Sequence, residues 1–221
     1  MPDDLIHFLA KVSIWAIPMV LAFTVHEAMH GFVARRYGDD TAERLGRLTL
    51  NPLKHIDPIG TIVVPCLALL LNIPVIGWAK PVPVNAAKLR NPRIDMAKVA
   101  AVGPVSNLIQ AFLWALLLAV LQRVSAAGNE PAWLMSMCTA GILVNALFAV
   151  FNMLPIPPLD GSRVLRSFVS PGVGNMLDRL EPFGFFILLG LLYAGVLNPL
   201  LTPLLNAVAQ LVTTLSGVDM R

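Results

Sequence analysis

The sequence predicts an all-α polytopic membrane protein with about five to six membrane segments. Of its 221 residues, 57% are hydrophobic and only 13% are charged, whereas roughly a quarter of an average soluble protein is charged. Apolar runs of roughly 20 residues, the length that crosses a bilayer core, recur along the whole chain. We therefore expect residues 1–221 to form a single integral-membrane domain, with a core over about 12–166 and a C-terminal helical pair over about 183–215.

Three segments are the clearest candidates for transmembrane helices: residues 12–34, 96–121 and 133–153. The first ends at RRYGDD, where paired charges return the chain to water. The third ends at NMLPIPPLDG, because three prolines in this stretch cannot continue a helix. The C-terminal pair then consists of residues 183–196 and 199–215, which are separated by the turn signal Asn198-Pro199.

Two stretches between the first and second spans are less regular. Residues 59–76 are apolar but contain Pro65, Asn72 and Pro74, so they either cross the membrane or re-enter it. The following KPVPVN is too rich in proline for a helix and suits an edge strand. We expect a small membrane-associated β-strand or hairpin near residues 78–86, with unpaired backbone groups that could accept another strand.

The Lys and Arg residues predict how the spans are oriented. If residues 59–76 cross fully, these cations are scattered over both faces of the membrane. If the region instead dips in and returns, all sixteen Lys and Arg except Lys11 and Arg123 share one face, Arg221 among them. Cytoplasmic loops carry an excess of Lys and Arg, so this face is predicted to be cytoplasmic. The same arrangement brings the ends of spans 12–34 and 133–153 to one membrane level.

The stretch FTVHEAMHGF, residues 23–32, places two histidines and a glutamate in an otherwise apolar helix. The spacing puts His26 and His30 one turn apart on one face, so both imidazoles can reach a single tetrahedral Zn²⁺. Glu27 then lies beside the metal, where it can move a proton during amide hydrolysis. The alternative is that the three side chains only form interhelical hydrogen bonds. Burying an ionisable glutamate in lipid without a partner or a function is costly, which favours the metal site.

A catalytic zinc needs a third protein ligand and an open position for water. Asp160 is the best candidate, because it follows the third span, has apolar neighbours and reaches the HEAMH level in the favoured topology. Its alternative role is an N-cap for the helix that follows. We expect His7 and His55 to be surface or interfacial residues, His7 near the opposite face and His55 in a polar loop.

The stretches HEAMH, GPVSN (103–107) and NMLPIPPLDG (152–161) together resemble the site-2 protease family of intramembrane zinc metalloproteases. The patterns of that family are HExxH, G-x-x-x-N and N-x-x-P-x-x-x-x-D-G. The resemblance extends over about residues 20–166, and the combination is far more specific than any one motif. Many relatives also carry a PDZ or CBS domain, for which this sequence has no room.

The resemblance implies one catalytic Zn²⁺ with three protein ligands, His26, His30 and Asp160. It implies that Glu27 is the general base and acid. Substrate-binding roles are implied for three further residues, Asn107, Asn152 and Pro155. From the residues alone, the alternative role of Asn107 is a hydrogen bond across helices, and that of GPVSN is close helix packing through its small residues. For Asn152 and Pro155 the alternative is a proline-driven helix stop.

Three other residues are expected to have structural roles. Cys66 and Cys138 fall inside apolar segments, so we expect two core thiols and no disulfide. We expect Asn145 to form a hydrogen bond between helices, which is worth about 1 kcal/mol.

These observations predict a zinc metalloendopeptidase that cleaves peptide bonds in or next to transmembrane segments of membrane-protein substrates, single-pass or already clipped. We expect a multi-pass protein of a prokaryotic cell membrane, with the active site toward the cytoplasmic face. The rival function is a catalytically silent, zinc-containing membrane binding or chaperone protein. A zinc transporter would need a file of ionisable groups through the membrane, which the sequence lacks. No nucleic-acid partner is expected, because the cations lie in loops beside the lipid bilayer.

Overall fold

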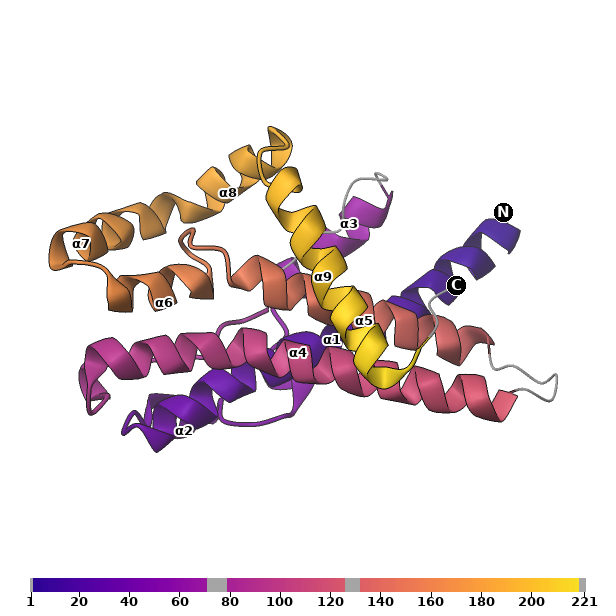
Figure 1. The fold of residues 1–221 in the computed structure, drawn as a ribbon, viewed down its shortest axis with the longest axis horizontal. Helices are drawn as coiled ribbons and strands as arrows, with labels where there is room; N and C mark the ends of the chain where they lie inside the picture. The colour runs from indigo at the N-terminus through magenta and orange to yellow at the C-terminus, as the bar shows by residue number, and fades with distance from the viewer. Residues whose placement is uncertain (1, 71–78, 126–131, 219–221) are drawn as a thin grey trace.

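The computed structural model describes residues 2–70, 79–125 and 132–218, and these residues form helices and connecting segments without a strand (Figure 1). The α-helices are α1 (Pro2–Arg36), α2 (Thr41–Arg44), α3 (Val64–Leu70), α4 (Pro92–Val124), α5 (Ala132–Asn152), α6 (Asp160–Phe168), α7 (Pro171–Leu180), α8 (Gly184–Tyr193) and α9 (Asn198–Ser216). Shorter helical turns cover Pro52–Lys54, Pro58–Val63, Ala86–Lys88 and Glu181–Phe183.

Within the described residues, four helical stretches are long and apolar enough to cross a membrane: Lys11–Arg36, Pro92–Val124, Ala132–Asn152 and Asn198–Ser216. They confirm an all-α membrane protein and the three clearest spans. Residues 184–193 form α8, which has only 10 residues and is too short to cross a bilayer core at about 1.5 Å per residue. The predicted C-terminal pair therefore contains one spanning-length helix, so the described part of the chain has fewer such helices than the five to six expected.

The region between α1 and α4 differs from the sequence prediction. Residues 59–70 are helical, as the turn Pro58–Val63 followed by α3, whereas residues 71–78 lie outside the described part of the chain. Whether the segment crosses or re-enters the membrane stays a prediction. Residues 79–85 have no regular secondary structure and 86–88 form a helical turn. The strand expected near 78–86 is therefore not formed over 79–86, since prolines interrupt the ladder of donors that a strand needs.

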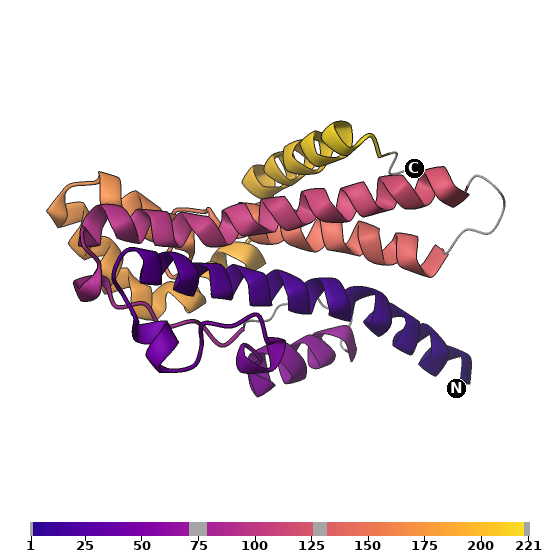
Figure 2. The same ribbon diagram turned by 90° about the horizontal axis from the view of Figure 1, so that it is seen from below.

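Helices α1, α4 and α5 pack against one another and form the centre of the molecule (Figures 1 and 2). Small residues line their contacts, among them the fully buried Ala22, Ala28, Ala34, Ala111 and Ala115. Small side chains let helix backbones approach closely, which is how helices associate in a medium as apolar as their own side chains. This close approach lets polar groups of one helix reach the next.

The two C-terminal helices hold the proline-containing loop in place. Leu154 and Leu159 of the loop are buried in a cluster with Leu188 of α8 and Leu201 of α9. Gly184 lies so close to the loop that a Cβ there would be 2.3 Å from the carbonyl oxygen of Pro157. The loop is irregular, but the surrounding protein buries part of it, which is the condition for non-helical backbone at membrane depth.

The ends of the bundle separate the charges largely as predicted. The end of α1, the start of α4 and all of α6 and α7 lie at one end, away from the start of α1, the end of α4 and the start of α5 (Figure 2). Helix α9 ends near the end of α4, and the side of the membrane expected for Arg221 stays a prediction. A Cβ on Gly217 would lie 3.5 Å from Nη2 of Arg123. Arg221 itself lies outside the described residues.

The structure corrects two predictions about single residues. His55 is buried, not superficial, with 2% of its surface exposed, because the turn that carries it folds inward and its Nε2 bonds the Thr49 carbonyl oxygen at 2.8 Å. Cys66 is an exposed free thiol, whereas Cys138 is a buried free thiol as expected. The side chain of His7 lies outside the described part of the structure.

We expect Gly141→Ala to destabilise the bundle, because the added methyl group would lie 2.5 Å from the Trp114 ring of α4. Overpacking of this kind costs about 1–3 kcal/mol. Gly190→Ala in α8 is the matched control, since no heavy atom lies within 4 Å of a Cβ there and alanine favours helix more than glycine does. Thermal unfolding in detergent should show a lower midpoint for Gly141→Ala alone, and equal midpoints would contradict the packing.

Candidate metal centre

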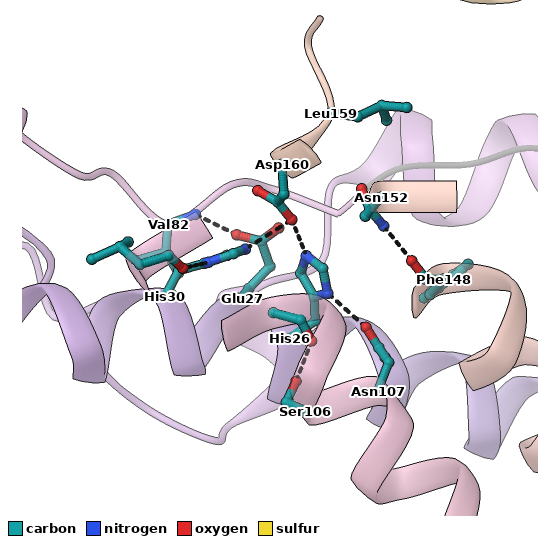
Figure 3. A network of polar contacts seen from close by, with 12 residues as sticks. His26, Glu27, His30, Val82, Ser106, Asn107, Phe148, Asn152, Leu159 and Asp160 are labelled. Carbon is teal, nitrogen blue, oxygen red and sulfur yellow. Dashed lines mark hydrogen bonds and ion pairs between the residues drawn. The ribbon is translucent and has the colours of Figure 1, made fainter. Parts of the chain in front are cut away.

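Three predicted ligands meet at one point, although Asp160 is far from the histidines in sequence. His26 and His30 project from one face of α1, and Asp160 is the first residue of α6 (Figure 3). Oδ2 of Asp160 lies 3.1 Å from Nε2 of His26 and 3.4 Å from Nε2 of His30. One potential ligand atom from each residue lies within 4.8 Å of the others. All three side chains are buried.

The hydrogen bond made by Nδ1, the ring nitrogen that points away from Asp160, fixes the tautomer of each imidazole. Nδ1 of His30 lies 2.7 Å from the carbonyl oxygen of Val99, and Nδ1 of His26 lies 2.6 Å from Oδ1 of Asn107. The Val99 oxygen can only accept a hydrogen bond, so Nδ1 of His30 carries the proton. The orientation of the Asn107 amide is fixed because its Nδ2 donates to Asn145 and Ala22. Nδ1 of His26 is therefore also the donor, and both Nε2 lone pairs face Asp160.

This arrangement suits a cation. Two Nε2 lone pairs and a carboxylate oxygen are all acceptors, and Oδ2 of Asp160 is buried without a hydrogen-bond partner. Acceptors this close repel one another inside a protein unless a positive charge lies between them. Two imidazoles and one carboxylate are a known donor set for catalytic zinc, which keeps its fourth position open. The residues therefore fit Zn²⁺.

Two buried asparagines connect the metal site to the helix contacts. Asn107 is fully buried and donates from Nδ2 to Oδ1 of Asn145 at 2.9 Å and to the Ala22 carbonyl oxygen at 3.3 Å. Asn145 in turn donates to the Gly141 carbonyl oxygen at 2.9 Å. The interhelical bond predicted for Asn145 is confirmed. The observed contact of Asn107 is with the ligand His26, and its contact with substrate stays a prediction.

Gly103 of α4 lies directly against both imidazole rings. A Cβ on this residue would be 2.6 Å from Cε1 and Nε2 of His30 and 2.7 Å from Cε1 of His26. Sequence reasoning gave close helix packing as one possible role of GPVSN and did not foresee that the packing partners of Gly103 are the ligands themselves. The available signal was the four-residue spacing of Gly103 and Asn107, which puts both on one helix face.

The position of Asp160 depends on the residue that follows it. A Cβ on Gly161 would lie 2.3 Å from the carbonyl oxygen of Met153, so only glycine lets the start of α6 close onto the loop. At the other end of α6, Arg93 of α4 donates to the carbonyl oxygens of Ser167 and Val169 at 2.8 and 2.6 Å. Asp160 does not act as the N-cap, because α6 begins with it and its N-cap is Leu159.

The remaining predicted site residues lie beside the metal ligands. Glu27 is half-buried, points toward the same space as His30 and Asp160 (Figure 3), and accepts a hydrogen bond from the Val82 backbone at 2.7 Å. Asn152 donates to the Phe148 carbonyl oxygen at 3.0 Å, and Pro155 is exposed in the loop before Asp160. Substrate contacts of the last two residues stay predictions. The backbone contact of Val82 was not foreseen.

We expect Gly103→Ala to weaken zinc binding by at least about 10-fold, because the new methyl group displaces both imidazoles and disturbed ligand support typically costs that much. The measurement is zinc retention by the purified protein against a competing chelator. Val105→Ala is the control, since Val105 is 47% exposed on the same helix. If Gly103→Ala retains zinc as well as the wild type, the positions of the imidazole rings do not depend on their close contact with residue 103.

Comparison with known proteins bears on the function of this site. Residues 124–192 match the family model described as Peptidase family M50. A Bacillus subtilis protein described as "Putative zinc metalloprotease YwhC" is 40% identical over 196 residues, which are 86% of this chain and 85% of the relative. "Putative zinc metalloprotease Rip2" of Mycolicibacterium smegmatis is 32% identical over 192 residues, 86% of this chain and 69% of the relative. No solved structure matches.

The alignment with the B. subtilis relative includes Asp160 and nearly all of the stretch that separates it from the two histidines, because it covers 86% of the chain. The family model adds the segment that carries Asn152 and Asp160. A donor set suited to zinc and an adjacent carboxylate are what a metalloprotease requires. The chain therefore belongs to peptidase family M50, the site-2 protease family, and is a zinc metalloprotease of the membrane.

Proposed function

We propose that this protein is an intramembrane endopeptidase, which hydrolyses peptide bonds in or next to the transmembrane segments of membrane proteins. The observation that carries the proposal is the depth of the site. His26 and His30 lie inside the spanning stretch Lys11–Arg36, ten and six residues before Arg36, which corresponds to about 15 and 9 Å along a helix. A peptide bond that reaches Glu27 must therefore enter the level of the membrane.

The residues divide the chemistry between them. When bound, zinc supplies a Lewis acid that polarises the scissile carbonyl and makes water more acidic. Glu27 takes a proton from the attacking water and delivers it to the leaving amine, so that water is added across the C–N bond. Asn107 and the Val99 carbonyl oxygen hold the Nδ1 protons of the two histidines and orient the rings so that each Nε2 faces the metal position.

A helical substrate must lose its helix locally before it is cut, because its backbone groups are bonded to one another in a spanning helix. Two non-helical segments of the enzyme reach the site, one through Val82 and the other through the loop that ends at Asp160. We propose that Asn152 and Pro155, which lie before Asp160 in this loop, contact the extended substrate. The partners would be membrane-protein substrates, single-pass or already clipped by another protease.

We further propose that the protein resides in a prokaryotic cell membrane with the site toward the cytoplasmic face. The support is the charge at the two ends of the bundle. Arg35 and Arg36 end α1 and Arg93 begins α4 at the end nearer the site, whereas Lys11 lies near the start of the first span and Arg123 near the end of α4. This asymmetry follows the positive-inside rule.

We expect Glu27→Gln to lower cleavage at least about 100-fold, because a general base contributes that much or more. Zinc content should equal that of the wild type, since Glu27 is not one of the three ligands. The assay measures cleavage of single-span substrates by purified enzyme, together with metal analysis. Glu43→Gln is the matched control, because Glu43 is an exposed partner of Arg35 at 2.8 Å.

The same variant separates the proposed enzyme from the rival binding or chaperone protein. A protein that keeps zinc only for structure predicts unchanged function in Glu27→Gln, because the metal stays bound. Near wild-type proteolysis by the purified variant would contradict the role of Glu27 as the general base.

The orientation is tested with single cysteines introduced after Cys66→Ser and Cys138→Ala. An impermeant thiol reagent should label Lys11→Cys in intact cells, whereas Ser170→Cys in the α6–α7 connection should react only after lysis. Both positions are exposed in the structure. The opposite labelling pattern would reverse the proposed orientation.

A further inference from the structure

The extended segment 79–85, which we call the strap, has no regular secondary structure but is held at several points. The Lys80 amide donates to the carbonyl oxygen of the buried His55 at 2.9 Å, and the Asn85 amide donates to Oδ2 of Asp39 at 2.6 Å. Arg47 donates to the Lys80 carbonyl oxygen at 2.9 Å. Asp39 and His55 are both buried, so both ends of the strap are fixed to the interior of the protein.

The composition of the strap makes it stiff. Pro81 and Pro83 have φ fixed by their rings and have no N–H. Val82 precedes a proline and is therefore restricted to extended conformations. Between Lys80 and Asn85 only Val82 and Val84 can donate from the backbone, and the Val84 amide makes no hydrogen bond with the described residues.

The strap approaches α1 closely beside the catalytic site. The Val82 side chain is 7% exposed, and a Cβ on Gly31 would lie 3.1 Å from its Cγ1. Gly31 directly follows the ligand His30, so the glycine in HEAMHG leaves room for the strap at this point. The Val82 amide thereby comes within 2.7 Å of Oε2 of Glu27 (Figure 3).

We propose that the strap is a positioning element for the general base, with the Val82 backbone amide as the group that orients Glu27. A glutamate side chain has three rotatable bonds, and one charge-assisted hydrogen bond to Oε2 fixes its carboxylate while the second oxygen stays available for water. The donor is itself immobile, because the anchors at Lys80 and Asn85 and the two prolines restrain it. This inference rests on the proposed function of Glu27.

The same contacts argue against the strap as an open strand edge, the role that its sequence suggested. The amides of Lys80, Val82 and Asn85 are all donated to the protein itself. An edge that binds substrate by strand addition needs free backbone donors as well as acceptors. Loss of a substrate-pairing edge would raise KM, whereas loss of a positioning group lowers kcat and leaves KM unchanged.

The kinetic test compares Val82→Pro, which removes the amide donor, with Val84→Pro, which removes an amide that has no partner among the described residues. The probes are synthetic single-span segments carrying a fluorophore and a quencher, in detergent micelles with zinc-loaded enzyme. We expect kcat of Val82→Pro to fall about 10- to 100-fold, the effect of a misplaced catalytic group, with unchanged KM and zinc content. Val84→Pro should stay within about twofold of the wild type. An ester linkage in place of the Val82 amide keeps the side chain and should reproduce the loss, even if Val82→Pro fails to fold.

A second measurement is independent of activity. Hydrogen exchange of residues 80–85 reports only four amides, because Pro81 and Pro83 have none. In the zinc-loaded wild type we expect Lys80, Val82 and Asn85 to exchange slowly. Glu27→Ala should add one rapidly exchanging amide to this segment, because Val82 loses its acceptor, whereas Glu43→Ala should add none. No gain in Glu27→Ala would overturn the contact.

The outcomes separate the inference from the proposed function. If wild-type enzyme cleaves no segment, or if Glu27→Gln cleaves normally, the proposed function fails, and exchange still decides whether Val82 binds Glu27. If Glu27→Gln is inactive while Val82→Pro and the ester variant keep the wild-type kcat, only the positioning role is overturned. A rise in KM with an unchanged kcat would assign the strap to substrate binding instead.

Discussion

Two imidazole nitrogens and one carboxylate oxygen point at one another inside an apolar helix bundle, a grouping that a bound cation stabilises. Val99 and Asn107 accept from the outer nitrogens of His30 and His26, so the inner lone pairs cannot turn away. Water that would screen their repulsion elsewhere is largely excluded from a buried site. The close helix packing, the short approach at Gly103 and the support of the proline loop all help to keep these three ligand atoms together.

The site is assembled from helices that each contribute a different kind of group. Helix α1 supplies two ligands and the base, α4 supplies the acceptors that orient the rings, and α6 supplies the third ligand. The C-terminal helices touch none of the ligands directly in the described contacts, but α8 packs Leu188 against Leu159, the residue before Asp160. Catalytic geometry therefore depends on packing beyond the ligands themselves, as expected where supporting contacts orient the ligands.

Local spacing was enough to predict His26, Glu27 and His30, because residues four apart share a helix face. The prediction of Asp160 also required the distribution of Lys and Arg between the two membrane faces. That distribution placed the ends of two spans, distant in sequence, at the same depth in the membrane. No strand forms over residues 79–86, because two prolines lack backbone donors and the amides of Lys80 and Asn85 bond to His55 and Asp39, both distant in sequence. The burial of His55 likewise depends on tertiary contacts that no local pattern encodes.

One stripe of α4 carries three successive positions that face the ligands, Val99, Gly103 and Asn107, spaced one turn apart. Val99 contacts the site through its main-chain oxygen and Asn107 through its side-chain amide. Gly103 leaves room for the imidazole rings because it has no side chain. Tolerance to substitution should therefore vary sharply along a single helix face. Position 99 is restricted only by the apolar cluster that buries it, position 103 excludes every side chain, and position 107 requires one particular functional group. A hydrophobicity profile of this helix does not reveal that substitutions at these three positions are restricted for three different reasons.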